Sequence, residues 1–334
     1  MPQVSNSSRG PEDAVVAVVV PCYRVRERVV EVLRAIPSWV RHIIVVDDAC
    51  PDGSGREVET TFTDPRCRVL YHERNQGVGG AVRTGIREAL RLGATIIVKL
   101  DGDGQMDPAR LSQVVRPIAE GRADYAKGNR LHDLQALATM PSARRFGNLA
   151  LTLLVKVASG YWDISDPTNG YIAIHRRAAA MLPLERIDRG YFFESHMLIH
   201  LNVIRAVVAE VPMPAHYAGE PSSLRVGRAL FSFPPKLLRG FARRIAWRYF
   251  IYNMDAVTVF LLAGALLFFG GVGFGAYRWY LGAFGDTTQT PGTVALGLFP
   301  SLIGFQMLLQ AMILDIMGRP TVPLQQIVSD DEPA

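Results

Sequence analysis

The chain has 334 residues, of which 49% are hydrophobic and 20% charged, and its formal net charge is +5. This composition excludes a mainly disordered chain, because it supplies enough apolar side chains for a sizeable core. The cysteines are three in number and lack metal-site spacing, so we expect free thiols in a reducing compartment, with the cytosol as default. They are Cys22, Cys50 and Cys67.

The first 13 residues are polar, and we expect a flexible tail without a secretory signal. After them, short apolar runs alternate with helical patterns. Apolar residues recur every three or four positions within 27–36 and 78–89, and a further helix is expected after Pro108. Continuous apolar or β-prone runs predict strands at 15–20, 43–47, 68–72, 95–100 and 123–127. This order predicts an α/β domain with a mostly parallel sheet, placed at residues 14–230.

Polar or glycine-rich segments follow each predicted strand. In chain order they read PCY, DDACPDGSG, ERNQGVGGAVR, DGDGQMDP and GNR. Ligands of open α/β sheets bind beyond the carboxyl ends of the strands. The sequence therefore predicts one substrate site at this edge of the sheet.

The segment DGDGQMDP holds three carboxylates with different expected roles. An EF-hand starting at Asp101 would place Met106 where glycine is required, so calcium-loop chemistry is excluded. Asp107 precedes Pro108 and is expected to cap the next helix. Asp101 and Asp103 remain free to share a divalent cation, Mg²⁺ or Mn²⁺, and such a cation suggests a diphosphate ligand.

The segment NQGVGGAVRTG partly matches a dinucleotide fingerprint. Val82 stands where the third glycine belongs, and the segment follows the third predicted strand instead of the first. Both differences argue against a hydride-transferring enzyme. The start of this helix still offers backbone N–H groups and Arg83 to an anion, with a plain tight turn as the alternative.

The last third of the sequence differs in character. Residues 256–277 and 291–314 contain no charged side chain, and each run exceeds the roughly 20 residues that span a bilayer. We expect two transmembrane helices within 255–316, with a pair of buried soluble helices as the alternative. Residues 231–252 mix basic and aromatic side chains, which predicts an amphipathic juxtamembrane helix.

The distribution of basic residues predicts the orientation of this hairpin. The loop between the two runs offers Arg278, balanced by Asp286. The positive-inside rule therefore places the large domain, both termini and the tail at 317–334 in the cytoplasm. The basic residues before the first run are Lys236, Arg239, Arg243, Arg244 and Arg248.

The ordered segments VVVPCY, VVDDACPDG, NQGVGGAVRTG, DGDGQMDP, GNR, DPTNGY and YFFES resemble the polyprenyl-phosphate branch of the family 2 glycosyltransferases. The resemblance covers residues 15–225, and that branch also contains members with two membrane helices. It implies a GT-A-like nucleotide-sugar-binding domain at the cell inner membrane. It further implies metal-dependent transfer of a sugar, with inversion, from a UDP- or GDP-sugar to a polyprenyl phosphate. The sequence departs from the family pattern at Arg24, Val25, Met106 and Ile172.

The resemblance also assigns residues to roles. Asp101 and Asp103 would hold the metal and diphosphate, and Gln105 would lie on the sugar side. Either Asp47 or Asp48 would face the base. The nucleotide candidates are Pro21, Tyr23, Asp47, Asp48, Gly77, Gly80 and Arg83.

A polyprenyl phosphate is already an anion at neutral pH, so no strong general base is needed to form the nucleophile. Candidates for binding the lipid phosphate are Arg130, Arg144, Arg145 and Asn148, which precede an apolar stretch. The remaining polar candidates near the sugar and the reacting atoms are Asp166, Asn169 and Glu194.

Two alternatives belong to other functional classes. A processive polysaccharide synthase is expected to carry a Gln-x-x-Arg-Trp motif and more spans, neither of which the sequence shows. A catalytically silent nucleotide-sugar-binding membrane protein is the second alternative. No nucleic-acid partner is expected, whereas the glycines at 270–275 suggest a homo-oligomer.

Overall fold

The computed structural model describes residues 14–131, 142–214, 226–285 and 288–327. These residues form two compact units, which we describe separately. The first, the α/β unit, comprises Met1–Phe241 and Pro320–Ala334, and the second, the hairpin unit, comprises Ala242–Arg319. The hairpin unit is therefore an insertion in the chain of the α/β unit.

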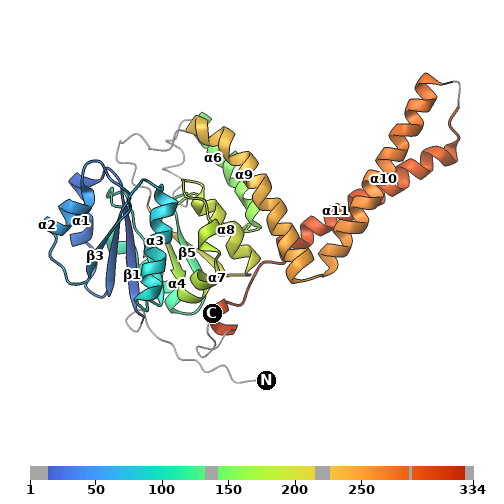
Figure 1. Ribbon diagram of the computed structural model, residues 1–334. Helices are drawn as coiled ribbons and strands as arrows, with labels where there is room; N and C mark the ends of the chain where they lie inside the picture. The colour runs from blue at the N-terminus through green and yellow to red at the C-terminus, as the bar shows by residue number, and fades with distance from the viewer. Residues whose placement is uncertain (1–13, 132–141, 215–225, 286–287, 328–334) are drawn as a thin grey trace, which may run out of the picture. The chain divides into compact units, whose positions relative to one another are not determined.

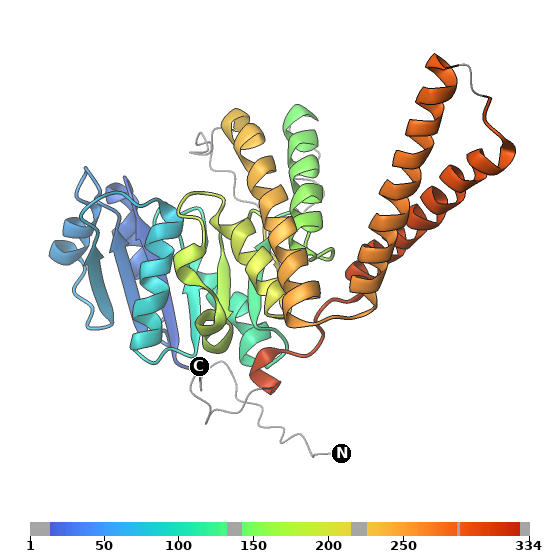
Figure 2. The same cartoon turned by 45° about the vertical axis from the view of Figure 1, so that its right-hand side comes forward.

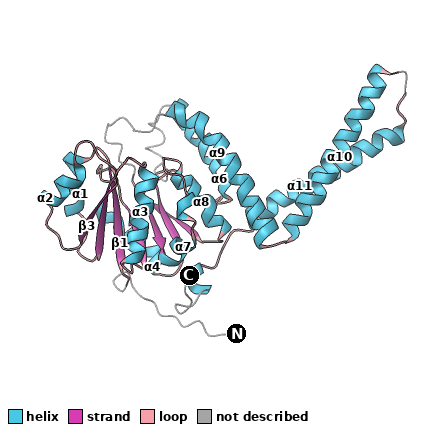
Figure 3. Cartoon of the chain, viewed as in Figure 1, coloured by secondary structure: helices cyan, strands magenta, loops and turns pink. Residues whose placement is uncertain are grey.

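A seven-stranded sheet lies at the centre of the α/β unit (Figures 1 and 3). Its order is β3-β2-β1-β4-β6-β5-β7, and only β6 runs antiparallel to its neighbours. The mostly parallel sheet is thus confirmed. The strands are β1 (Val16–Cys22), β2 (His42–Asp47), β3 (Cys67–Tyr71), β4 (Ile96–Lys99), β5 (Tyr125–Asn129), β6 (Ile172–His175) and β7 (Val208–Pro212).

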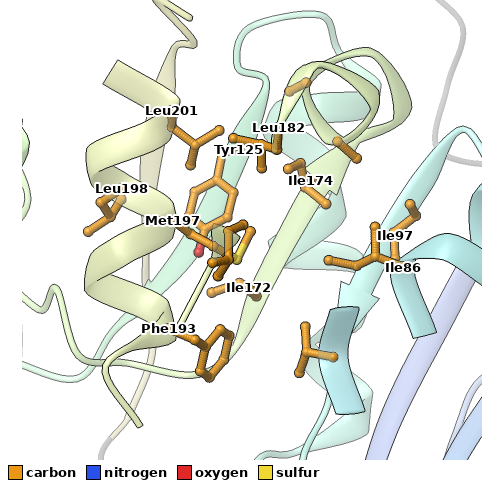
Figure 4. Packing of buried hydrophobic residues seen from close by; sticks show 14 of the residues in the cluster. Ile86, Ile97, Tyr125, Ile172, Ile174, Leu182, Phe193, Met197, Leu198 and Leu201 are labelled. Atoms are coloured by element: carbon orange, nitrogen blue, oxygen red, sulfur yellow. The ribbon is translucent and has the colours of Figure 1, made fainter. Parts of the chain in front are cut away.

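Helices cover both faces of the sheet because its strands carry apolar side chains in both directions. In β1, Val18 belongs to one core cluster and Val19 to the other, as the alternation of side chains along a strand requires. One face is covered by α1 (Arg26–Arg34), α2 (Ser54–Thr61) and α4 (Leu111–Ala119). The other is covered by α3 (Val78–Arg91), α6 (Ser142–Ser159), α7 (Arg176–Met181) and α8 (Phe193–Val203). Figure 4 shows part of this second core, where Tyr125, Ile172 and Met197 lie close together.

The order of the strands determines where a ligand can bind. From β1 the chain proceeds outward through β2 and β3, and it then returns to β4 on the opposite side of β1. Open α/β sheets bind ligands at such a switch point, beyond the carboxyl ends of the strands. Here the two flanking strands lead into Tyr23 and Asp101.

The C-terminal segment returns to the α/β unit and ends in α12 (Leu324–Ile327). Its backbone N–H groups at Leu324 and Gln325 donate to the carboxylate of Asp124, at 2.9 and 3.3 Å. Asp124 is fully buried and also accepts from the Val207 N–H at 2.8 Å. Because Asp124 immediately precedes β5, the end of the chain helps to fix one strand of the sheet.

The hairpin unit contains two helices that are long and apolar enough to cross a membrane, α10 (Ala256–Phe284) and α11 (Pro291–Met317) (Figure 2). They follow α9 (Val226–Ala246) and a π-helical segment at Trp247–Tyr252. Glycines let the two backbones approach closely, as at Gly304, where an added Cβ would overlap the backbone of Phe268.

A charged cluster lies where α10 begins and α11 ends. The guanidinium of Arg244 is fully buried and donates to both oxygens of Asp315, at 2.8 and 2.9 Å. The Tyr249 hydroxyl donates to the same carboxylate at 2.5 Å. Such a bidentate pair fixes geometry as well as charge, so it ties the chain before α10 to the end of α11.

Replacing Asp124 tests the contribution of the C-terminal segment. We expect Asp124→Asn to lower the free energy of unfolding by roughly 1–3 kcal/mol, because buried N–H donors lose an acceptor. A reduced melting temperature of the detergent-purified protein measures this. Gln326→Ala is the control, since this exposed side chain makes one hydrogen bond, to the Gly121 carbonyl. Equal melting temperatures for the wild type and Asp124→Asn would contradict the assignment.

Candidate active site at the carboxyl edge of the sheet

The loop after β4 presents Asp101 and Asp103, and both are partly exposed. The Asp103 carboxylate accepts the Gln105 N–H at 3.0 Å, which closes the loop on itself. Asp107 accepts the Ala109 N–H at 2.9 Å as the N-cap of a 3₁₀ turn at Pro108–Arg110, and its predicted capping role is confirmed. Two carboxylates therefore remain at the strand end for chemistry.

A buried lysine joins Asp101 to a second carboxylate. Lys99, the last residue of β4, is 3% exposed, and its Nζ lies 2.9 Å from Asp101 Oδ2 and 3.7 Å from Glu194 Oε1. Burial alone lowers the pKa of Lys99, but Asp101 and Glu194 outweigh it, and the net pKa lies above the ordinary value. Lys99 was not predicted as a site residue, although a lone lysine within a buried strand is a usable signal, since lysine is buried only when paired.

Glu194 lies in the first turn of α8, and its pKa is raised. Burial is the main cause, and the nearby cations Lys99 and Lys127 oppose it. Gly170, of the DPTNGY segment, packs so closely that an added Cβ would overlap the Lys99 ammonium and lie 2.8 Å from Glu194 Oε1. Three separate segments of the sequence thus meet at one charged cluster.

Asp166 and Arg130, predicted for different roles, form an ion pair. Arg130 Nε donates to Asp166 Oδ2 at 2.9 Å, and Nη2 donates to Oδ1 at 3.2 Å. Burial raises the pKa of Asp166, but the opposing effect of Arg130 is larger. The net pKa of Asp166 therefore lies below its ordinary value. Glu210 of β7 accepts the Asp166 N–H at 2.9 Å and the Asn129 side-chain amide at 2.8 Å, so it holds this loop in place. No sequence signal marks Glu210, because its partners come from β5 and from the loop before β6.

Two further polar residues lie beneath this loop. Lys127 of β5 is fully buried and donates to the Pro167 carbonyl at 2.6 Å. Burial lowers its pKa to about 8, although Asp166 and Glu194 partly oppose the shift. Asn169 is 2% exposed and accepts the Tyr171 N–H at 2.9 Å. The oxygen of Asn169 therefore shapes the loop that carries Gly170.

The two aspartates at the end of β2 both accept hydrogen bonds from backbone donors. Asp47 accepts the N–H groups of Cys50 and Gly55, each at 2.7 Å. Asp48 accepts those of Gln76 and Gly77, each at 2.8 Å. Each carboxylate organises a loop, and a contact of either with a base stays a prediction. On the neighbouring strand end, Pro21 is half-buried and Tyr23 is 43% exposed.

The start of α3 is more enclosed than the sequence predicts. The Gly77 N–H donates to Asp48, and the Gly80 N–H donates to the Arg189 carbonyl at 3.2 Å. Arg83 is 4% exposed and pairs with Glu185 of the 3₁₀ turn at Leu184–Arg186. The N–H groups expected to be free at Gly77 and Gly80 are thus occupied by protein acceptors, and nucleotide contacts there stay predictions.

The remaining acceptor candidates lie on α6. The side chains of Arg144, Arg145 and Asn148 lie outside the described residues. Farther along the helix, Leu149 is 67% exposed and Leu153 53% exposed. The apolar stretch that follows the predicted phosphate-binding residues is therefore presented outward.

One departure from the family pattern has a local explanation. Arg24, where asparagine is usual, has φ of 58°, in the left-handed region that asparagine tolerates better than most residues. Its N–H lies 2.9 Å from Cys50 Sγ, which helps to hold this conformation. Arg24 therefore adopts a backbone conformation that asparagine would also tolerate.

The donors available for a metal ion are few. Within the part of the chain that the structure describes, no group of three or more His, Cys, Asp or Glu side chains could hold one. Asp101 and Asp103 supply hard carboxylate oxygens, and Mg²⁺ commonly takes one or two carboxylates and completes its shell with water and phosphate. The pair fits a cation of that kind.

Solved structures share this fold. Glucosyl-3-phosphoglycerate synthase from Mycobacterium tuberculosis, in complex with phosphoglyceric acid, matches with a TM-score of 0.52 and 18% identity, over 72% of this chain and 82% of that one. The same enzyme in complex with Mg²⁺ and UDP matches with a TM-score of 0.51 at 17% identity, over 73% and 84%. The α/β unit therefore has a GT-A-like fold.

Sequence comparisons identify the family. The model of Glycosyl transferase family 2 matches residues 17–182. Polyprenol monophosphomannose synthase of Mycolicibacterium smegmatis is 33% identical over 59% of this chain and 75% of its own length. Undecaprenyl-phosphate mannosyltransferase of Micrococcus luteus is 30% identical over 51% and 70%. The chain belongs to glycosyltransferase family 2 and is related to enzymes named for polyprenyl-phosphate acceptors.

The lowered pKa of Lys127 predicts how stability depends on pH. Between the folded pKa of about 8 and the unfolded value near 10.4, the unfolded chain binds more protons, so stability rises with pH in this window. Lys127→Met removes this titration. From pH 8 to 9.5 the wild type should therefore gain about 2 kcal/mol relative to the variant. Melting temperatures of both proteins across this range test it, and parallel pH profiles would contradict it.

Proposed function

We propose that the protein transfers a sugar from a UDP- or GDP-linked donor to a polyprenyl phosphate of the undecaprenyl type, with inversion and with dependence on a divalent metal. One observation carries the proposal. Asp101 after β4 and Glu194 of α8 both lie within ion-pair distance of one buried cation, Lys99, at the sheet edge where ligands of this architecture bind. The relatives named for polyprenyl-phosphate acceptors support the choice of acceptor.

The donor would lie across the ends of β1 and β4. The exposed ring of Tyr23 offers a surface for the nucleoside, beside Pro21. Asp101 and Asp103 would hold Mg²⁺ or Mn²⁺, which when bound neutralises charge on the departing diphosphate. Gln105 is exposed on the same loop and would face the sugar, with Asn169 and Glu194.

The acceptor would approach through α6. Its phosphate would be bound by Arg130, Arg144, Arg145 and Asn148, and the outward leucines of α6 suit an apolar chain or membrane surface. Asp166 would serve the reaction by holding the Arg130 guanidinium in one orientation. A side chain fixed in this way loses little entropy when it binds an anion.

The reaction needs no proton transfer at its nucleophile. An acceptor phosphate oxygen forms a bond to the anomeric carbon, and the bond from that carbon to the diphosphate oxygen breaks. The electron pair leaves with the nucleoside diphosphate. Attack opposite to the leaving group gives inversion, and the protein contributes alignment and electrostatic stabilisation.

The same proposal covers the location of the protein. The two apolar helices would form a hairpin in the cell inner membrane, with the α/β unit and both termini in the cytoplasm. The basic residues before α10 support this orientation. Residues 231–252 would lie along the membrane surface. Homo-oligomer formation would use glycines of α10 that face away from α11, such as Gly270 and Gly273.

Replacing one carboxylate of the pair tests the metal role. We expect Asp103→Asn to reduce sugar transfer on the order of 100-fold or more, because the metal ion that stabilises the departing diphosphate would lose one of its carboxylate ligands. A chelator should abolish transfer by the wild type. Asp107→Asn is the matched control in the same loop, since asparagine also caps a helix, and it should retain activity. Full transfer by Asp103→Asn with a chelator present would refute the metal role.

A further inference from the structure

The ammonium of Lys99 donates a hydrogen bond to the Asp101 carboxylate, which a metal ion would need as a ligand. Its Nζ lies 2.9 Å from Asp101 Oδ2, and the ring of Phe193 lies beneath it, 5.5 Å from Nζ to the ring centroid. The close packing of Gly170 confines it from another side. An ammonium has three donors and no acceptor, so it must remain beside an anion in this buried position.

A second anion lies within reach of the same ammonium. Glu194 Oε1 is 3.7 Å from Nζ, beyond a good hydrogen bond but within ion-pair distance. A small rotation of the lysine side chain would exchange Asp101 for Glu194 as its closest partner. Lys99 is therefore shared between the proposed metal carboxylate and the proposed sugar-side carboxylate.

A divalent cation at Asp101 would compete with this ammonium. Two cations on one carboxylate repel each other, and a shift of the ammonium toward Glu194 relieves only part of that repulsion. The diphosphate of a donor brings negative charge that offsets the rest. The cation should thus bind weakly alone and well together with a diphosphate.

We propose that Lys99 is a positioning residue that makes cation binding at Asp101 and Asp103 conditional on the donor diphosphate, and that its ammonium moves to Glu194 when the cation binds. The inference rests on the metal-dependent function proposed above. Its consequence is that Glu194 becomes the closest partner of the ammonium only when metal and donor are both present. The metal side and the sugar side of the site are then assembled in one step.

Mn²⁺ binding to the purified full-length protein, measured by electron paramagnetic resonance without nucleotide, tests this directly. Lys99→Met removes the charge and keeps the length, and it should bind Mn²⁺ at least about tenfold more tightly than the wild type. Lys99→Arg keeps the charge and should retain weak binding. Lys236→Met removes an exposed lysine that pairs with Asp188 instead, and it should leave Mn²⁺ affinity unchanged.

A second variant gives an independent readout. Glu194→Gln removes the carboxylate that receives the ammonium, so it should weaken Mn²⁺ binding, opposite in sign to Lys99→Met. Adding UDP or GDP should strengthen Mn²⁺ binding by the wild type more than by Lys99→Met. If Lys99→Met binds Mn²⁺ no more tightly than the wild type, or if Glu194→Gln binds it more tightly, the inference fails.

The outcomes also distinguish a failure of this inference from a failure of the proposed metal-dependent function. A wild type that binds Mn²⁺ and transfers sugar, beside a Lys99→Met variant of unchanged affinity, overturns the role of Lys99 alone. A wild type that binds no Mn²⁺ even with UDP and GDP, and that transfers sugar in a chelator, overturns both the metal dependence and the inference.

Discussion

A buried charge in this protein requires an opposite charge or backbone hydrogen-bonding groups beside it, because an isolated ion loses far more solvation than packing can restore. The sheet meets this requirement twice at its carboxyl edge. Lys99 lies between Asp101 and Glu194, and Asp166 is matched by Arg130 with Lys127 close by. These groups come from β4, β5 and the loops that follow them, from the loop before β6 and from α8, so the pairs position remote segments of the proposed site relative to one another.

The same constraint operates in the hairpin unit. Arg244 and Asp315 are far apart in sequence, yet their bidentate pair closes the base of the two helices. Tyr249 and Arg248 surround the same carboxylate. Away from this cluster the backbones of the two helices approach closely at glycines such as Gly264, Gly271 and Gly304. A chain that crosses a bilayer is expected to confine its charges in this way, at helix ends and in pairs.

Much of the fold is predictable from the sequence because its signals are local. The continuous apolar runs of β1, β2 and β4 and the periodic pattern of α3 depend on neighbouring residues only. β6 and β7 were not predicted from the sequence. Their segments, IAIH and VAEVP, are too short to show a periodic pattern, and their pairing depends on strands distant in sequence. The docking of the C-terminal segment on Asp124 is likewise visible only in three dimensions.

The candidate site likewise combines features with local sequence signals and features that depend on long-range contacts. The carboxylates after β4 are recognisable from their spacing, and so is the capping role of Asp107. The occupation of Asp48 by the start of α3 is not, because its donors come from a loop 28 or more residues away. Lys99 and Glu210 act through contacts with segments remote in sequence. Sequence motifs therefore mark the groups that face a ligand, whereas the groups that hold them in place emerge from the fold.

Direct observation of the lipid product tests the central claim. The purified protein would be incubated with undecaprenyl phosphate and a panel of UDP- and GDP-sugars, and the lipids would be analysed by mass spectrometry. We expect one donor to yield undecaprenyl phosphate heavier by a single sugar, and only with Mg²⁺ or Mn²⁺ present. Absence of any glycosylated lipid with all donors, or a product carrying a growing sugar chain, would contradict the account.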